Sequence, residues 1–83
     1  EWPAIARHYS ADENGNVFKG DGVAVDSNGN LAFAEDGHCV TLLGVKDLIV
    51  VQSGDATMVC HKDRAQEVKA LAQKVSDKHP GLS

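Results

Sequence analysis

Basic residues are scarce in this chain, and long apolar runs are absent. Of its 83 residues, 8 are Lys or Arg and 12 are Asp or Glu, which gives a formal net charge of −4. A nucleic-acid-binding domain needs a basic face to neutralise phosphates. The longest apolar runs, such as residues 48–51, span four residues, whereas a membrane-spanning helix needs roughly 20. We therefore expect neither a nucleic acid nor a membrane as a partner.

The short length limits the chemistry that the chain can support. A chain of this size forms one domain and buries only about 60–65% of its unfolded surface, which argues against a deep substrate cleft. Its glycines match no phosphate-binding loop, and no nucleophile lies in a pattern with a base. We expect no catalytic residue, no metal ligand and no cofactor site, so that the 83 residues are not themselves an enzyme.

Cysteine is also rare, with only Cys39 and Cys60 present. A secreted domain of this size usually carries more cysteines. We therefore expect two buried thiols in a reducing cytoplasm, with a single disulfide as the alternative. The neighbouring His38 and His61 could complete a zinc site only if adjacent strand residues pointed the same way, which the alternation of a strand opposes. Zinc is not expected.

Residues 11–61 alternate between short apolar stretches and glycine turns. The turn at residues 26–30 repeats the Asp-x-Asn-Gly-Asn pattern of residues 12–16 at an offset of 14. Neither turn is a calcium loop of the EF-hand type, because the required glycine and glutamate are missing at the sixth and twelfth positions. Short strands at such intervals favour a sandwich, a barrel or a coiled β-solenoid. The predicted strands are 17–18, 23–25, 31–33, 39–43, 48–51 and 56–60.

The fifth of these stretches, residues 48–51, is a continuous β-branched and leucine run. Such a run is typical of a strand that is buried on both faces. We therefore predict that it forms the core.

Helical periodicity occurs at both ends of the chain. Apolar residues spaced by three and four predict a short helical turn over residues 1–10. Residues 63–77 are predicted to form a helix, with Asp63 as its N-cap and Gln66 completing a capping box. The apolar face of this helix consists of Ala65, Val68, Leu71, Ala72 and Val75. We expect residues 1–83 to form a single domain: the turn, the strands of 11–61 and the helix.

Several motifs occur in an order that is typical of one protein family. They are Trp2, 12–17, 20–21, 26–27, 44–51, 55–56, 63–64 and 66–69. In this order they resemble the C-terminal segment of bacterial mannose-1-phosphate guanylyltransferases (GDP-mannose pyrophosphorylases). The resemblance extends from Trp2 to about Val75, and its later block is the more specific one.

The resemblance implies a parent enzyme of GDP-mannose biosynthesis, a nucleotidyltransferase that joins GTP and mannose 1-phosphate and releases pyrophosphate. The parent would use Mg²⁺. The glycine-rich nucleotide loop and the metal-binding aspartates of that family are absent from this chain, so no catalytic residue is carried over. An N-terminal catalytic domain would be the missing partner, and the start at Glu1 rather than Met also suggests a piece of a longer chain.

The resemblance also implies a fold and a role. The fold would be mostly β, with short strands in a left-handed β-helix-like arrangement and a C-terminal α-helix. The chain would be a non-catalytic, cytoplasmic structural domain that pairs subunits into a homodimer. Leu71 and Val75, at the exposed flank of the helical stripe, are the candidate interface residues. The alternative is a stand-alone β-rich module that binds a ligand or a protein through the loops at 12–16 and 26–30.

Overall fold

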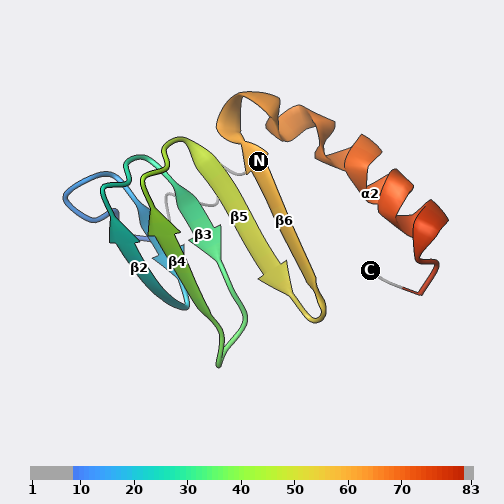
Figure 1. The fold of residues 1–83 in the computed structure, drawn as a ribbon, viewed down its shortest axis with the longest axis horizontal. Coiled ribbons are helices and arrows are strands. Elements are labelled where there is room, and N and C mark those ends of the chain that lie inside the picture. Colours follow the sequence, from blue (N-terminus) through green and yellow to red (C-terminus); the bar gives the residue numbers. More distant parts are fainter. Residues whose placement is uncertain (1–8, 82–83) are drawn as a thin grey trace.

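The computed structural model describes residues 9–81, which form two small sheets followed by two helical segments (Figure 1). Its strands are β1 (Val17–Lys19), β2 (Asp21–Val25), β3 (Leu31–Phe33), β4 (Cys39–Leu43), β5 (Leu48–Ser53) and β6 (Ala56–His61). A 3₁₀ helix, η1 (Lys62–Glu67), and an α-helix, α2 (Val68–Lys78), follow them. Each strand-like stretch of the sequence is a strand in the structure. The predicted helical turn over 1–10 lies, apart from its last two residues, outside the described residues.

The chain passes through the strands in successive turns of a coil. β1, β3 and β5 pair in parallel and β6 joins β5 antiparallel, which gives a four-stranded sheet in the order β1-β3-β5-β6. β2 and β4 form a second, parallel pair. Because β1 to β5 alternate between the two sheets, the chain makes successive turns of a β-helix-like coil, which Figure 1 shows as two layers. This arrangement confirms the predicted fold class.

The two turns of the coil differ in length. Val17 of β1 pairs with Leu31 of β3, an offset of 14 that equals the offset of the repeated turn in the sequence. Leu31 in turn pairs with Ile49 of β5, at an offset of 18. A single residue, Gly20, connects β1 to β2, whereas residues 34–38 connect β3 to β4. The longer turn therefore takes up its extra residues in the loop between β3 and β4.

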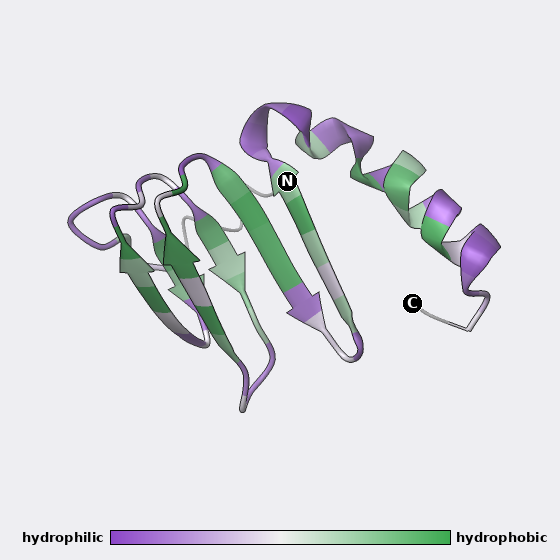
Figure 2. Ribbon diagram, viewed as in Figure 1, coloured by the Kyte–Doolittle hydropathy of each residue, from purple (hydrophilic) through white to green (hydrophobic). Residues whose placement is uncertain are grey.

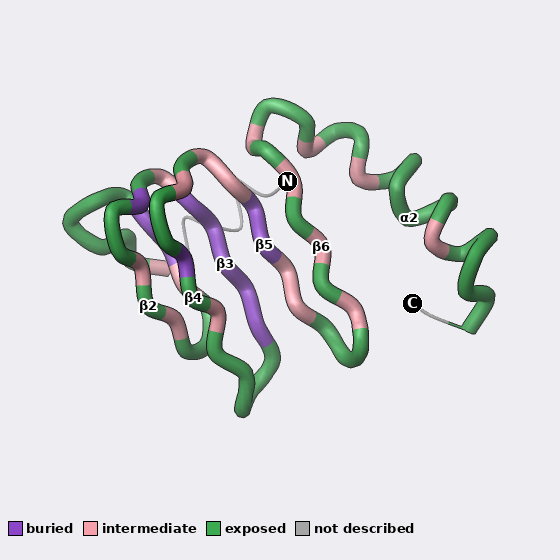
Figure 3. Tube along the Cα trace, in the orientation of Figure 1, coloured by how far each residue is buried: buried purple, intermediate pink, exposed green. Residues whose placement is uncertain are grey.

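The core lies on both faces of the four-stranded sheet. Between the two sheets, Ala32, Leu42 and Val50 form one buried cluster. A second cluster on the opposite face includes Phe33 and Ile49. Ile49 and Val50 are neighbours on one strand and therefore point to opposite faces, and both are buried. The prediction that β5 is buried on both faces is thus confirmed, and Figure 3 shows the burial concentrated in β3 and β5.

Two asparagines are fully buried at one corner of the coil. The Asn16 Oδ1 atom accepts hydrogen bonds from the backbone N–H (3.0 Å) and the Nδ2 group (2.9 Å) of Asn30. The Asn30 Oδ1 atom accepts one from the Leu48 N–H in the next turn (2.8 Å). Their Nδ2 groups donate to the carbonyls of Ser27 and Val45 at 2.8 and 3.2 Å. Each asparagine therefore connects its own turn of the coil to the next one.

In each turn of the coil, the residue directly before the corner position (Asn16, Asn30 or Leu48) adopts a left-handed backbone conformation. Gly15, Gly29 and Asp47 have φ angles of 78°, 70° and 57° in successive turns of the coil. Their stacking is held by backbone hydrogen bonds from Gly29 to the Asn14 carbonyl (3.0 Å) and from Asp47 to the Asn28 carbonyl (3.1 Å). Glycine adopts this conformation without a steric penalty, which explains why Asn-Gly recurs at this corner.

The C-terminal helix differs from its prediction at its start. Residues 62–67 form a 3₁₀ helix, within which Arg64 has non-helical angles (φ −117°, ψ 17°), and the α-helix begins at Val68. The N-cap is His61 rather than Asp63, because the His61 ring nitrogen Nδ1 accepts the hydrogen bond of the Asp63 N–H (3.1 Å). The expected capping box from Asp63 to Gln66 is therefore wrong.

The expectation of two buried thiols is wrong for Cys39. Both cysteines are free, but Cys39 is exposed and Cys60 is half-buried. On β4 the odd-numbered side chains face outward while Leu42 faces the core, so the strand's alternation exposes Cys39.

Among residues 9–81, no helix is long and apolar enough to cross a bilayer.

We expect Asn30→Ala to lower the free energy of unfolding by about 2–3 kcal/mol, because it leaves the Leu48 N–H buried without its partner and opens a small cavity. Urea unfolding followed by circular dichroism measures the change. Asn28→Ala, at an exposed position two residues earlier, is the matched control and should change it by no more than about 0.5 kcal/mol. Equal effects of the two substitutions would contradict a special role for the buried asparagine.

Candidate functional site

No chemical centre is assembled within residues 9–81. Among these residues, no three His, Cys, Asp or Glu side chains lie close enough together to hold a metal ion. The two pairs that the sequence offered for zinc are separated by the fold, since His38 and Cys39 lie at β4 in the small sheet and Cys60 and His61 lie on β6 in the large one. The candidate site that the described residues do form is a surface groove.

A groove runs between β6 and α2. Its volume is about 760 Å³. Apolar side chains from the two elements and from the end of β5 form most of its walls: Val51, Ala56, Met58, Val59, Val68, Leu71, Ala72 and Val75. Both interface candidates of the sequence, Leu71 and Val75, line it. We call this surface the β6–α2 groove.

Helix α2 is held to the strands mainly through η1. It contacts η1, and η1 in turn packs on β5 and β6. Figures 1 and 2 show the helix standing apart from β6, with alternating apolar and polar bands along its length. None of its 11 residues is buried, and Leu71 is 42% exposed while Val59 across the groove is 54% exposed. A helix this short is only marginally stable in water unless one of its faces is packed. Within residues 9–81, the apolar stripe of α2 stays partly exposed to solvent.

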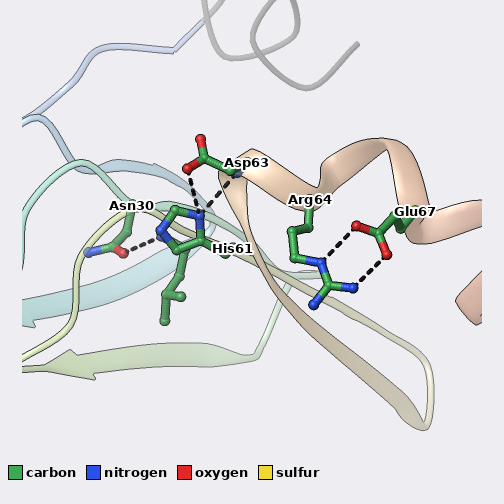
Figure 4. A network of polar contacts seen from close by, with 6 residues as sticks. Asn30, His61, Asp63, Arg64 and Glu67 are labelled. Atoms are coloured by element: carbon green, nitrogen blue, oxygen red, sulfur yellow. Dashed lines mark hydrogen bonds and ion pairs between the residues drawn. The ribbon is translucent and has the colours of Figure 1, made fainter.

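An adjoining pocket beside η1 shares Val59, Val68 and Leu71 with the groove and is also lined by charged side chains, Arg64, Glu67 and Lys74. Here Arg64 donates two hydrogen bonds to the Glu67 carboxylate, from Nε (2.7 Å) and Nη2 (2.6 Å), which Figure 4 shows. The guanidinium lowers the pKa of Glu67, and the carboxylate raises the pKa of Arg64. Both side chains are exposed, so the pair positions charge at the edge of the groove and adds little stability.

A second polar contact ties the β3–β4 loop to the β5–β6 hairpin. The Glu35 carboxylate accepts a hydrogen bond from the Gly54 N–H. The Glu35 N–H donates to the Gln52 Oε1 atom (3.0 Å), and the Gln52 Nε2 group donates to the Gly54 carbonyl (3.0 Å). The bond from the Gly54 N–H, followed by a hydrogen bond from the Ser53 side chain, holds the pKa of Glu35 below its ordinary value of 4.5. The contact fixes the hairpin that carries one wall of the groove.

Comparison with known proteins identifies the coil. The profile of the MannoseP isomerase/GMP-like beta-helix domain family matches residues 20–75. The chain belongs to this β-helix domain family. The match covers the coil from the Gly20 connection onward, together with η1 and most of α2.

The similar proteins that are known by sequence are much longer than this β-helix domain. It is 43% identical over 72 residues to the alginate biosynthesis protein AlgA of Pseudomonas aeruginosa, a match that covers 87% of this chain and 15% of that protein. It is 40% identical over 74 residues to the mannose-1-phosphate guanylyltransferase of Salmonella montevideo, covering 89% and 16%. The resemblance to the C-terminal segment of the guanylyltransferases is therefore confirmed, and the chain spans about one sixth of these relatives.

A solved structure shares the fold. The crystal structure of mannose-1-phosphate geranyltransferase from Thermus thermophilus superposes with a TM-score of 0.75 at 36% identity. The match covers 90% of this β-helix domain and 23% of that chain.

The sequence located one wall of the groove and missed the other. Leu71 and Val75 stand out by helical periodicity, but Val59 and Met58 on β6 were not singled out as groove residues. The apolar character of residues 56–60 was the available signal. It could not reveal that the helix would lie opposite this strand, because that position depends on the bend within η1.

The folded protein should lose stability in acid through Glu35. Because folding lowers the pKa of this carboxyl, its contribution is present above its unfolded pKa of about 4.5 and is lost as the pH falls through the folded value. We expect Glu35→Gln to flatten the decline of the unfolding free energy between about pH 5 and pH 3, measured by urea titration at each pH. Asp36→Asn at the next exposed position is the control, and the same flattening there would refute the assignment to Glu35.

Proposed function

We propose that this chain is the non-catalytic assembly domain of a mannose-1-phosphate guanylyltransferase and that it pairs with a second copy of itself. The observation that carries the proposal is the uncovered β6–α2 groove in a domain whose relatives include guanylyltransferases. The parent would make GDP-mannose and pyrophosphate from GTP and mannose 1-phosphate in the cytoplasm. Nucleotide, sugar phosphate and Mg²⁺ would be bound by a catalytic domain outside these 83 residues.

The architecture suits an assembly role. The coil is short and its register is held by buried asparagines, so it can support an adjoining helix in a defined position. Exposed Leu71 and half-buried Val75 line the groove from that helix. A surface of apolar side chains at the centre with charged groups at the rim is typical of protein–protein interfaces.

The polar loops are less suited to the alternative role of a ligand-binding module. In the loop at 12–16, the Asp12 carboxylate accepts hydrogen bonds from the N–H groups of Asn14 and Asn16, both at 2.9 Å. In the loop at 26–30, Ser27 and Asn30 are buried and bonded within the coil. These side chains are engaged in holding the turns, which favours assembly over ligand recognition.

Sedimentation equilibrium in the presence of a reductant should detect dimers of the 83-residue chain at high micromolar concentration. Leu71→Glu places a charge in the apolar groove and should raise the dimer dissociation constant at least about tenfold. Gln73→Glu, on the opposite side of α2, adds the same charge outside the groove and should leave the constant within about twofold. A chain that stays monomeric at every concentration would refute self-pairing.

The 83-residue chain should form no GDP-mannose from GTP and mannose 1-phosphate with Mg²⁺, because the residues that would bind nucleotide are not in it. Chromatographic detection of the nucleotide sugar tests this. Any turnover above a heat-denatured control would refute the non-catalytic assignment.

A further inference from the structure

One side of α2, next to the β6–α2 groove, carries a row of mostly charged residues. Glu67, Leu71, Lys74 and Lys78 are spaced by four, three and four residues, so they form a row along one side of α2. Glu67 stands at the N-cap of the helix and Lys78 is its last residue. Next to this row lies the apolar stripe. Its central residue is Ala72, with Val68 one turn before it and Val75 one turn after it.

The end charges of this row are complementary in the antiparallel orientation and opposed in the parallel one, while the two Lys74 residues of an antiparallel pair lie about 6 Å apart along the axis near the crossing point. Two copies related by a two-fold axis would place their α2 helices antiparallel, with the start of each beside the end of the other. If the helices cross at Ala72, Val68 of one faces Val75 of the other, and Glu67 of one faces Lys78 of the other. The residual offset is one residue, or about 1.5 Å along the axis. A parallel pair would instead set Glu67 against Glu67 and Lys78 against Lys78.

Local structure favours the same contact. Ala72 has the smallest side chain of the stripe, which allows two helices to approach closely at the crossing point. Arg64 holds the Glu67 carboxylate in a fixed position at the groove edge with two hydrogen bonds, and carboxylate oxygens can accept further donors. The charged row and the exposed stripe are thus presented together on one side of the helix.

We propose that α2 of a second copy covers the β6–α2 groove, antiparallel to the first α2 and crossing it at Ala72, with Glu67 of each copy beside Lys78 of the other. This inference rests on the proposed self-pairing and specifies its geometry. It assigns Glu67 and Lys78 as the residues that set the orientation, and it assigns Leu71, Val68 and Val75 as the buried centre.

Charge-reversed variants test the geometry. Glu67→Lys alone brings two lysines together at each contact, and Lys78→Glu alone brings two glutamates together, so each variant should dimerise more weakly than the native chain. Mixed together, the two variants restore an opposite-charge pair at both contacts. We expect the equilibrium constant for exchange into the heterodimer to exceed its statistical value by at least about tenfold at low salt, measured by native mass spectrometry.

The control mixture combines Glu67→Lys with Lys69→Glu. Lys69 lies on the other edge of α2, so this mixture has the same net charges without the facing pair. It should stay within about twofold of the statistical value. The preference of the test mixture should also fall as salt is raised from about 50 to 500 mM, because exposed charge pairs are screened. Circular dichroism confirms that each variant keeps its helix.

The outcomes separate this inference from the proposed function. Heterodimer enrichment in the test mixture alone supports the antiparallel contact. Native dimers with equal mixing in both mixtures would overturn this geometry and leave self-pairing intact. A native chain that stays monomeric would overturn both, and the groove would then belong to another part of a longer protein or to a different protein.

Discussion

The buried contact between Asn16 and Asn30 is the interaction on which the coil depends. Parallel strands that pair through their backbones alone can slip by two residues without exchanging their faces. The asparagine side chains oppose such a slip, because each bonds to particular backbone groups in the next turn. The corresponding position in the third turn is Leu48, whose N–H donates to the Asn30 Oδ1 atom. Its apolar side chain forms no such bond to a further turn. Directly after the strand that begins there, the chain reverses into an antiparallel hairpin.

The placement of the core explains why the helix is left uncovered. Both faces of the four-stranded sheet already hold buried clusters around Ile49 and Val50. The helix is attached through η1 at the edge of this sheet, where β6 offers only the alternating side chains of a terminal strand. Its apolar stripe therefore faces a groove rather than a core. Exposed apolar surface of this kind is typical of interaction sites.

Much of the fold could be predicted from the residues, but little of the surface could. Glycine turns and apolar stretches located the strands of residues 9–81, and the repeat offset of 14 equals the offset between the paired strands β1 and β3. The β-helix arrangement came from family resemblance, since short strands are also compatible with a sandwich or a barrel. Asn16 and Asn30 were recognised only as turn residues, because a local motif does not reveal which side chains point inward. The start of the helix, the exposure of Cys39 and the far wall of the groove depend on tertiary contacts.

The unequal turns of the coil show where its length is free to vary. The corner residues of successive turns stay stacked although one turn is four residues longer than the other. The extra residues lie in the loop at 34–38, away from the corner that holds Asn16 and Asn30. The one-residue connection at Gly20 lies on this same side in the preceding turn and is closely packed there, since a Cβ atom at Gly20 would lie 2.9 Å from the Ala34 carbonyl oxygen. One side of the coil therefore accepts a single glycine in one turn and a five-residue loop in the next, so the length of a connection can change from turn to turn without loss of the strand stacking.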